Sequence, residues 1–147
     1  MIEPVEQITD KSLRRHFGYS LKRAYARVHT AITEELNQLG LKVISYSALS
    51  MIVENPGLKQ SQLAEALMIE RSNLVVIIDD LENKNLIYRA QLPSDRRAYA
   101  LIPTDEGKAL AVRAGDAVAD AEAAVFGHFD PALIEQLRPA FDRIWSR

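Results

Sequence analysis

The stretch ERSNLVVIIDDLENK, residues 70–84, decides between two folds. Its centre, LVVIIDD, is an apolar and mostly β-branched run that ends in two aspartates, which is typical of a buried parallel strand carrying an acidic metal or phosphate site. Leu74, Ile77, Ile78 and Leu81, however, follow the i, i+3, i+4, i+7 spacing of one helical face, and this face continues past the aspartates. We therefore predict a helix. A small α/β enzyme or receiver-like domain built on LVVIIDD is the alternative.

The composition is that of an ordinary folded protein. The chain has 147 residues, of which 48% are hydrophobic and 26% charged. It has no cysteine, which excludes disulfide bonds and cysteine nucleophiles and fits a reducing cytoplasm. No apolar stretch approaches the roughly 18 residues of a membrane helix, and the first residues, MIEPVEQITDK, lack the pattern of a secretory signal. We expect a cytoplasmic protein with no membrane partner.

The sequence offers little that suggests catalysis. It contains neither a nucleophile elbow nor a glycine-rich phosphate loop. Asp79 and Asp80 are neighbours in the predicted helix, so their side chains diverge, and no third ligand lies nearby to complete a metal site. We expect no enzyme activity, no cofactor and no metal.

The segments around residues 70–84 predict a helix-turn-helix. A long amphipathic helix is expected over residues 12–39, ending at Gly40, with shorter helices over 47–54 and 59–67. Met68-Ile69-Glu70 is the turn before the helix of the opening stretch, and Ser72 and Asn73 are residues of the N-cap type.

The following residues predict a wing. Residues 86–92 and 98–102 are two strand-like runs, and the turn between them, Pro93-Ser94-Asp95-Arg96-Arg97, carries two arginines. A helix in the major groove with an arginine in the adjacent minor groove is a known way of binding DNA. A long alanine-rich helix over 105–126 and a last helix beginning at Asp130-Pro131 complete the chain.

Several short motifs between Leu58 and Leu110 resemble the MarR family of bacterial transcriptional regulators. They are PGLKQSQLAEAL, ERSNL, LENKNLIYR, SDRR with its Asp-x-Arg, and TDEGKAL. The resemblance implies a mainly α, single MarR-like chain over residues 1–147, with a winged helix-turn-helix at 41–104 and a two-stranded wing. Residues 1–40 and 105–147 would form the flanking N- and C-terminal helices of an interlocked dimerisation region.

The function implied is that of a homodimeric regulator, a repressor that binds double-stranded DNA at a palindromic operator and releases it when a small aromatic or anionic effector binds. The expected DNA-binding residues are Lys59, Ser61, Gln62, Arg71, Ser72, Asn73, Val76, Arg89, Asp95, Arg96 and Arg97. Two departures from the family weaken the positive charge of the recognition helix: Val76 stands where a basic or polar residue is common, and Asp80 where an arginine is common.

The remaining assignments concern the dimer and the effector. The expected dimer contacts are Leu13, Phe17, Leu21, Phe141, Ile144 and Trp145. A candidate ligand pocket consists of His16, Tyr19 and Arg23 on one flank of the first helix, with Tyr46 expected close by. Ordinary surface packing is the alternative for these four residues.

Overall fold

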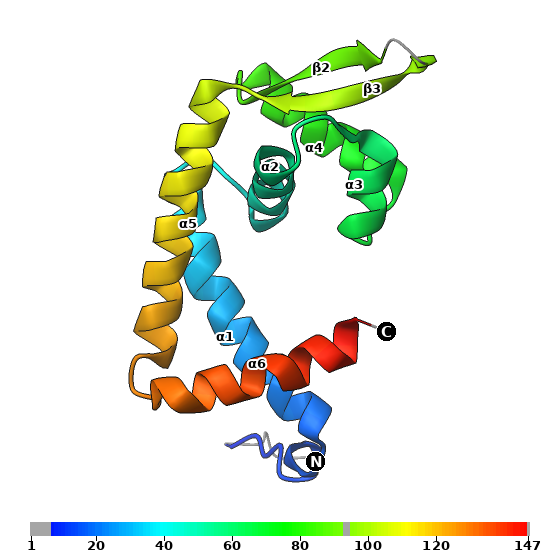
Figure 1. Cartoon of the computed structure of the whole chain (residues 1–147). Helices are drawn as coiled ribbons and strands as arrows, with labels where there is room; N and C mark the ends of the chain where they lie inside the picture. The colour runs from blue at the N-terminus through cyan, green and yellow to red at the C-terminus, as the bar shows by residue number, and fades with distance from the viewer. Residues whose placement is uncertain (1–6, 93–94, 147) are drawn as a thin grey trace, which may run out of the picture.

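The computed structural model describes residues 7–92 and 95–146, and the side chains within these ranges except those of residues 92–98. The fold is mainly helical with a small antiparallel sheet (Figure 1). Its elements are the 3-10 turn η1 (Leu13–Arg15), α1 (Phe17–Gln38), α2 (Val43–Glu54), β1 (Leu58–Lys59), α3 (Gln60–Ala66), α4 (Arg71–Asn83), β2 (Ile87–Leu92), β3 (Asp95–Pro103), α5 (Asp105–Phe126) and α6 (Pro131–Trp145).

The stretch quoted at the outset is a helix, α4. Leu74, Ile78 and Leu81 are completely buried along one side of it, as the helical spacing predicts. The strand alternative is wrong, and the α/β enzyme built on it falls with it. The N-cap is Glu70, whose backbone is extended, so Ser72 and Asn73 lie in the first turn and do not cap the helix as expected. Their side chains are therefore free to point outward.

The first helix is shorter than predicted. The backbone of His16 is extended (φ −101°, ψ 122°) and separates η1 from α1. Asp10 holds the preceding segment, because its carboxylate accepts hydrogen bonds from Arg14 (2.6 Å) and Tyr19 (2.6 Å). At the other end Gly40 takes a positive φ of 70°, which terminates the helix as expected.

The sheet has three strands in the order β1-β3-β2. β2 and β3 form the predicted hairpin, with Ile87 opposite Pro103 and Arg89 opposite Leu101. The additional strand, β1, is only two residues long, and Leu58 pairs with Leu101. Two residues are too few to show strand alternation, so the sequence gives no sign of this strand. β3 ends at Pro103, which lacks the N–H that would continue the ladder.

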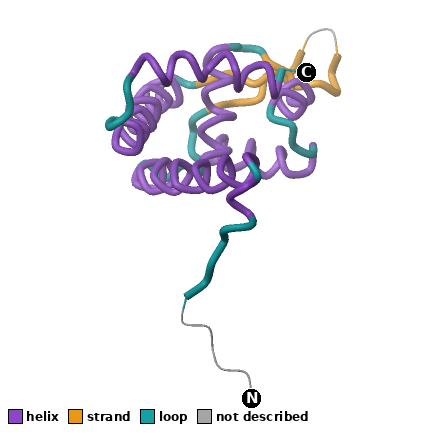
Figure 2. The backbone as a smooth tube through the Cα atoms, turned by 90° about the horizontal axis from the view of Figure 1, so that it is seen from below, coloured by secondary structure: helices purple, strands orange, loops and turns teal. Residues whose placement is uncertain are grey.

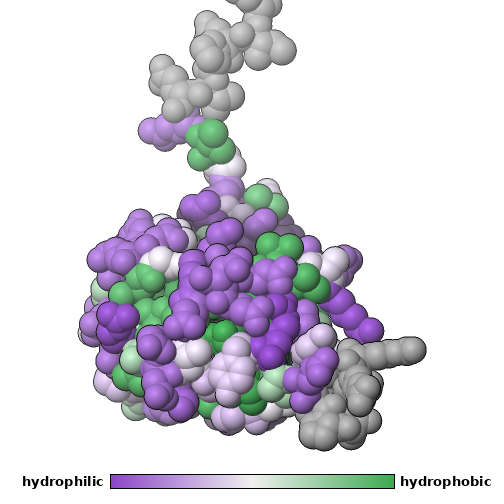
Figure 3. Space-filling model, turned by 90° about the horizontal axis from the view of Figure 1, so that it is seen from above, coloured by the Kyte–Doolittle hydropathy of each residue, from purple (hydrophilic) through white to green (hydrophobic). Residues whose placement is uncertain are grey.

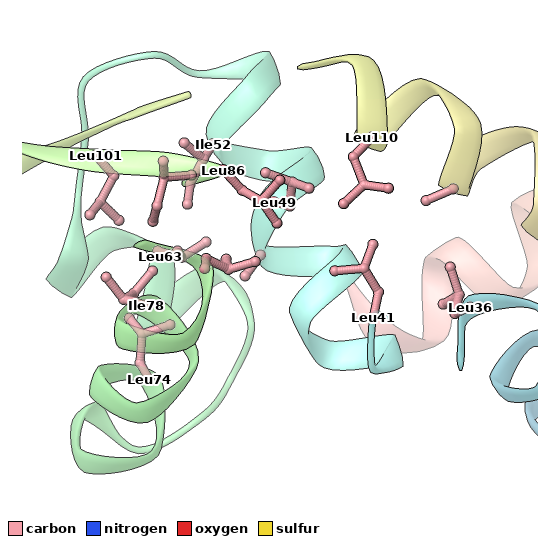
Figure 4. Packing of buried hydrophobic residues seen from close by; sticks show 14 of the residues in the cluster. Leu36, Leu41, Leu49, Ile52, Leu63, Leu74, Ile78, Leu86, Leu101 and Leu110 are labelled. Carbon is pink, nitrogen blue, oxygen red and sulfur yellow. The ribbon is translucent and has the colours of Figure 1, made fainter. Parts of the chain in front are cut away.

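One apolar core joins the winged helix to the two long helices. Leu49 and Ile52 of α2 lie among residues from α4 and the sheet (Figure 4). Leu41 and Leu110 extend the same cluster to the linker after α1 and the start of α5. The helices α2 to α4 and the sheet are therefore attached to α1 and α5 by packing and not only by the chain.

The two long helices, α1 and α5, pack against each other and extend away from the sheet (Figure 1). Seen from below, the helices lie in front of the strands (Figure 2). α6 begins at the N-cap Asp130, whose carboxylate accepts from the backbone N–H of Ala132, and it crosses α1 away from the sheet. Among the described residues it makes few contacts with the rest of the chain. No helix in the described ranges combines the length and apolarity needed to cross a membrane.

The junction between the sheet and α5 is unusually close. The Thr104 hydroxyl donates to the Asn85 carbonyl (2.8 Å) and accepts from the backbone N–H of Gly107 (2.9 Å). A Cβ atom on Gly107 would lie 2.0 Å from the carbonyl oxygen of Leu86. Only glycine therefore allows this approach of helix to strand.

We expect Gly107→Ala to lower the free energy of unfolding by about 1–3 kcal/mol, because the clash is with backbone and no rotamer relieves it. The intrinsic helix preference of alanine acts in the opposite direction. Gly115→Ala in the same helix is the matched control, since its Cβ would meet only the Tyr46 hydroxyl at 3.5 Å. Urea unfolding followed by circular dichroism measures both variants, and a Gly107→Ala protein as stable as Gly115→Ala would contradict the prediction.

Candidate nucleic-acid interface

The first two turns of α4 expose a mixture of polar and apolar side chains. Ser72, Asn73 and Val76 all project away from the buried Leu74, and Val76 is 69% exposed. An amide, a hydroxyl and a branched alkyl group are the side chains that read base edges and thymine methyls in a major groove. The structure thus brings the three predicted base-reading residues together on one surface.

The beginning of α3 adds to this surface. Ser61 and Arg71 line the same shallow hollow between the first turns of α3 and α4. Lys59 is exposed immediately before α3. The side-chain oxygen of Gln62 accepts a hydrogen bond from the backbone N–H of Lys59 (3.0 Å) at the N-terminus of this helix. No ion-pair partner for Lys59 or Arg71 occurs among the residues whose side chains are described, so both cations face solvent.

Arg89 occupies a different position from the other expected DNA contacts. Its guanidinium forms ion pairs with Asp79 and Glu82 of α4, and its backbone N–H donates to Glu82 (3.1 Å). Partial burial opposes its protonated form, but the hydrogen bond to Asp79 and the charge of Glu82 prevail and raise the pKa of Arg89. The Arg89 side chain is directed toward α4 and is 20% exposed.

The wing hairpin lies beside α4 and extends beyond it (Figure 1). The side chains of Asp95, Arg96 and Arg97 fall outside the described residues, so their assignment to DNA stays a prediction. The backbone of β3 begins at Asp95, which places these three residues at the start of that strand. The face seen from the side of the sheet is mostly hydrophilic with separate apolar patches (Figure 3).

The two aspartates of LVVIIDD have separate partners. Asp79 pairs with Arg89, and Asp80 pairs with Lys84 at 2.8 Å. No group of three metal-ligating side chains that could hold an ion occurs in the described part of the chain. The pairings with Arg89 and with Lys84, which also donates to the Gly40 carbonyl (3.0 Å), were not foreseen from the sequence. The i, i+3 spacing of Asp79 and Glu82 places both carboxylates on one side of the helix. This spacing is the sequence feature from which a shared partner could have been predicted.

A second surface, on α1 and α6, is apolar and exposed. A groove of about 510 Å³ runs between these helices and the end of α5, with Leu21, Phe126 and Phe141 among its lining residues. All of the residues expected at the dimer contact are exposed in the described chain: Leu13, Phe17, Leu21, Phe141, Ile144 and Trp145. Large apolar side chains exposed on two adjacent helices indicate a surface that another protein covers.

The residues of the candidate ligand pocket occupy two places in the described chain. Tyr19 and Arg23 line a small hollow with Asp10, and the hydrogen bond to Asp10 raises the pKa of Tyr19. Tyr46 lies in α2, with its hydroxyl next to Gly115 of α5. Because a helix rises 1.5 Å per residue, roughly 20 Å of α1 separates Arg23 from the end that adjoins α2. Tyr46 is not among the residues that line the hollow of Tyr19 and Arg23, and a pocket shared by the four residues stays a prediction.

The arrangement defines a class of protein. Two short helices joined by a turn, an exposed second helix with base-reading side chains and an adjoining hairpin form a winged helix-turn-helix, whose second helix enters the major groove of DNA.

Comparison with known proteins identifies the family. The model of the MarR family matches residues 43–99. Over 113 residues the chain is 33% identical to a Thauera aromatica protein named for transcriptional regulation of the hcr operon, covering 76% of this chain and 68% of that protein. It is 31% identical to the transcriptional repressor CouR bound to a 23-mer DNA duplex, with a TM-score of 0.89 and coverage of 97% and 100% of the two chains.

A second structure is of CouR from Rhodococcus jostii RHA1 bound to p-coumaroyl-CoA, at 31% identity and a TM-score of 0.80, covering 90% of this chain and 93% of that one. The chain belongs to the MarR family of transcriptional regulators, as its motifs indicated.

We expect Val76→Arg to strengthen binding to non-specific duplex DNA, because it places a cation on the exposed side of α4 where phosphates are within reach. The slope of log affinity against log salt concentration should steepen by about one for each added phosphate contact, which is about two per dimer. Fluorescence anisotropy across a salt series measures the slope. Val112→Arg is the matched control, since Val112 is 65% exposed but lies on α5. Equal slopes for the two variants would show that Val76 does not face the duplex.

Proposed function

We propose that the protein is a transcriptional repressor that binds a palindromic operator as a homodimer and releases it on binding a small aromatic acid or its thioester. The observation that carries the proposal is the exposed tip of α4, where Ser72, Asn73 and Val76 stand beside a wing in the described fold. The likeness to a DNA-bound repressor over 97% of the chain supports it. In this proposal residues 41–104 bind DNA, and 1–40 together with 105–147 hold the dimer.

The dimer follows from the apolar surface on α1 and α6. A second copy of the chain could cover Phe17, Phe141 and Trp145, which are otherwise exposed to water. Two-fold symmetry then presents two recognition helices to one side of the duplex. Half-sites one helical turn apart, about 34 Å, would accept both helices at once.

Recognition of the operator divides between bases and phosphates. Asn73 can pair bidentately with adenine, and the methyl groups of Val76 can pack on a thymine methyl. Lys59 and Arg71 are exposed cations at the edge of this surface, suited to phosphates. Arg97 would enter the minor groove with Asp95 orienting its guanidinium, and Arg96 would meet phosphate.

The effector class rests on chemistry and on the relative. CouR binds p-coumaroyl-CoA, the thioester of an aromatic acid. In this chain the Tyr46 hydroxyl of α2 faces Gly115 of α5, while Arg23 and His16 present cationic and polar groups at the far end of α1. A ligand between the long helices and the winged helix would change the separation of the two recognition helices and thereby lower operator affinity.

We expect Arg97→Ala to weaken binding to the operator by about 1–3 kcal/mol while the dimer stays folded, because it removes a minor-groove cation. Electrophoretic mobility shift with DNA from upstream of the protein's own gene measures the loss. Arg113→Ala is the matched control, an exposed arginine on α5. The prediction is contradicted if both variants bind alike. If the unmodified protein binds none of this DNA, the proposed function itself is unsupported.

We expect an aromatic carboxylate or its thioester to release the bound operator, and Tyr46→Ala or Arg23→Ala to abolish release without loss of DNA binding. An anisotropy titration of the preformed complex measures release. The variant that fails to respond identifies the end of α1 at which the ligand binds. Normal release of the operator from both variants would show that these residues have only an ordinary packing role and do not bind the effector.

A further inference from the structure

Arg89 stands at the base of the wing and reaches across to the recognition helix. It lies on β2 opposite Leu101, whose completely buried side chain fixes that position of the sheet in the core. The two terminal nitrogens of its guanidinium bind different carboxylates. Nη1 donates to Glu82, and Nη2 donates to Asp79. A third hydrogen bond runs from its backbone N–H to Glu82. One residue of β2 is thus joined to α4 at three points, two through its side chain and one through its backbone.

The acids that Arg89 binds lie close to the base-reading surface. Asp79 follows Val76 by three residues and Ser72 by seven, so all three share one side of α4. The Asp79 side chain is 52% exposed, whereas that of Arg89 is 20% exposed. The guanidinium is therefore covered between helix and strand, and the carboxylate is the more solvent-accessible partner.

We propose that Arg89 is a positioning residue that fixes the wing to the recognition helix through Asp79 and Glu82, and that it does not itself bind DNA. This proposal rests on the proposed function, since it concerns how the two DNA-contacting elements keep their separation. The planar guanidinium suits the task because its fixed fork can hold two carboxylates at once. A wing free to swing would place its arginines in the minor groove less often, and specific affinity would fall.

The alternative, that Arg89 contacts a phosphate, makes opposite predictions for the acids. Neutralising Asp79 and Glu82 removes two negative charges from the DNA-facing side of each subunit. Simple electrostatics then predicts tighter binding, and all the more if Arg89 is released toward a phosphate. Loss of the clamp predicts weaker binding to the operator. The sign of the change therefore separates the two roles.

The experiment is a double-mutant cycle between Arg89→Gln and the combined variant Asp79→Asn with Glu82→Gln, read as operator affinity of the full-length dimer. We expect Arg89→Gln alone to lower affinity about tenfold, and to change it less than about twofold in the acid-neutralised background. The salt slope should stay within about 0.5 of that of the unmodified protein, whereas a lost phosphate contact lowers it by about one per subunit. Arg89→Lys should remain weaker, because one ammonium cannot reproduce the fork.

Glu70→Gln is the matched control for charge, since Glu70 is exposed at the start of α4 and is not among the acids that Arg89 binds. Its affinity should not fall. Tighter binding by the acid-neutralised variant, additive effects in the cycle, or full rescue by Arg89→Lys would each overturn the proposal.

Amide hydrogen exchange without DNA tests the link between wing and helix separately from DNA binding. Arg89→Gln and the acid-neutralised variant should both speed exchange of the β2 amides, including that of residue 89, at an unchanged melting temperature. Unchanged exchange in both variants would overturn the clamp even if the operator is bound. Faster exchange in a protein that binds no operator would instead count against the proposed function alone.

Discussion

Burial of the apolar stripe on α4 is the constraint on which the other features depend. Leu74, Ile78 and Leu81 are fully removed from water, and each such side chain contributes roughly 1.5–3 kcal/mol of transfer free energy. Once this side of the helix is turned inward, Val76 and Asn73 must face outward. The same packing fixes the start of the wing, because Leu86 enters the core three residues after the helix ends.

The winged helix is rigidly attached to the long helices at two places. Leu41 and Leu110 share its core, and the Thr104 hydroxyl joins the start of α5 to the Asn85 carbonyl in the turn before β2. Close packing has few alternative arrangements, so a displacement of α1 or α5 is passed on to α4 rather than absorbed locally. Lys84, which donates to the Gly40 carbonyl at the end of α1, provides a polar link along the same route.

Much of this fold was predictable from the sequence, for a physical reason. The 3.6-residue period of the apolar positions identified α4, and the predicted bounds of α5 agree with the structure. Helix starts were less predictable, because Glu70 and Lys42 serve as N-caps without a side-chain capping bond and so leave no mark in the sequence. The break at His16 was missed because the hydrogen bonds of Asp10 that hold it depend on the folded chain.

The candidate site was predictable in part. Exposure of Ser72, Asn73 and Val76 follows from helix geometry once the buried stripe is known. Arg89 was assigned to DNA because it is basic and near the wing, but residues ten and seven positions earlier in the chain bind it. The hollow that Tyr19 and Arg23 line does not include Tyr46, and apolar spacing alone does not place α1 relative to α2.

The ion pairs of Arg89 also change the charge that the recognition helix, α4, presents. The second half of α4 carries Asp79, Asp80 and Glu82, which would repel phosphates if left unpaired. Arg89 and Lys84 neutralise them from the wing and from the next turn. At the first turn Arg71 stays exposed, beside the side chains proposed to meet bases. In a protein with a formal net charge of −2, affinity for DNA must come from where its cations stand and not from its overall charge. Internal pairing of the acids on α4 therefore removes a repulsion that would oppose the proposed binding.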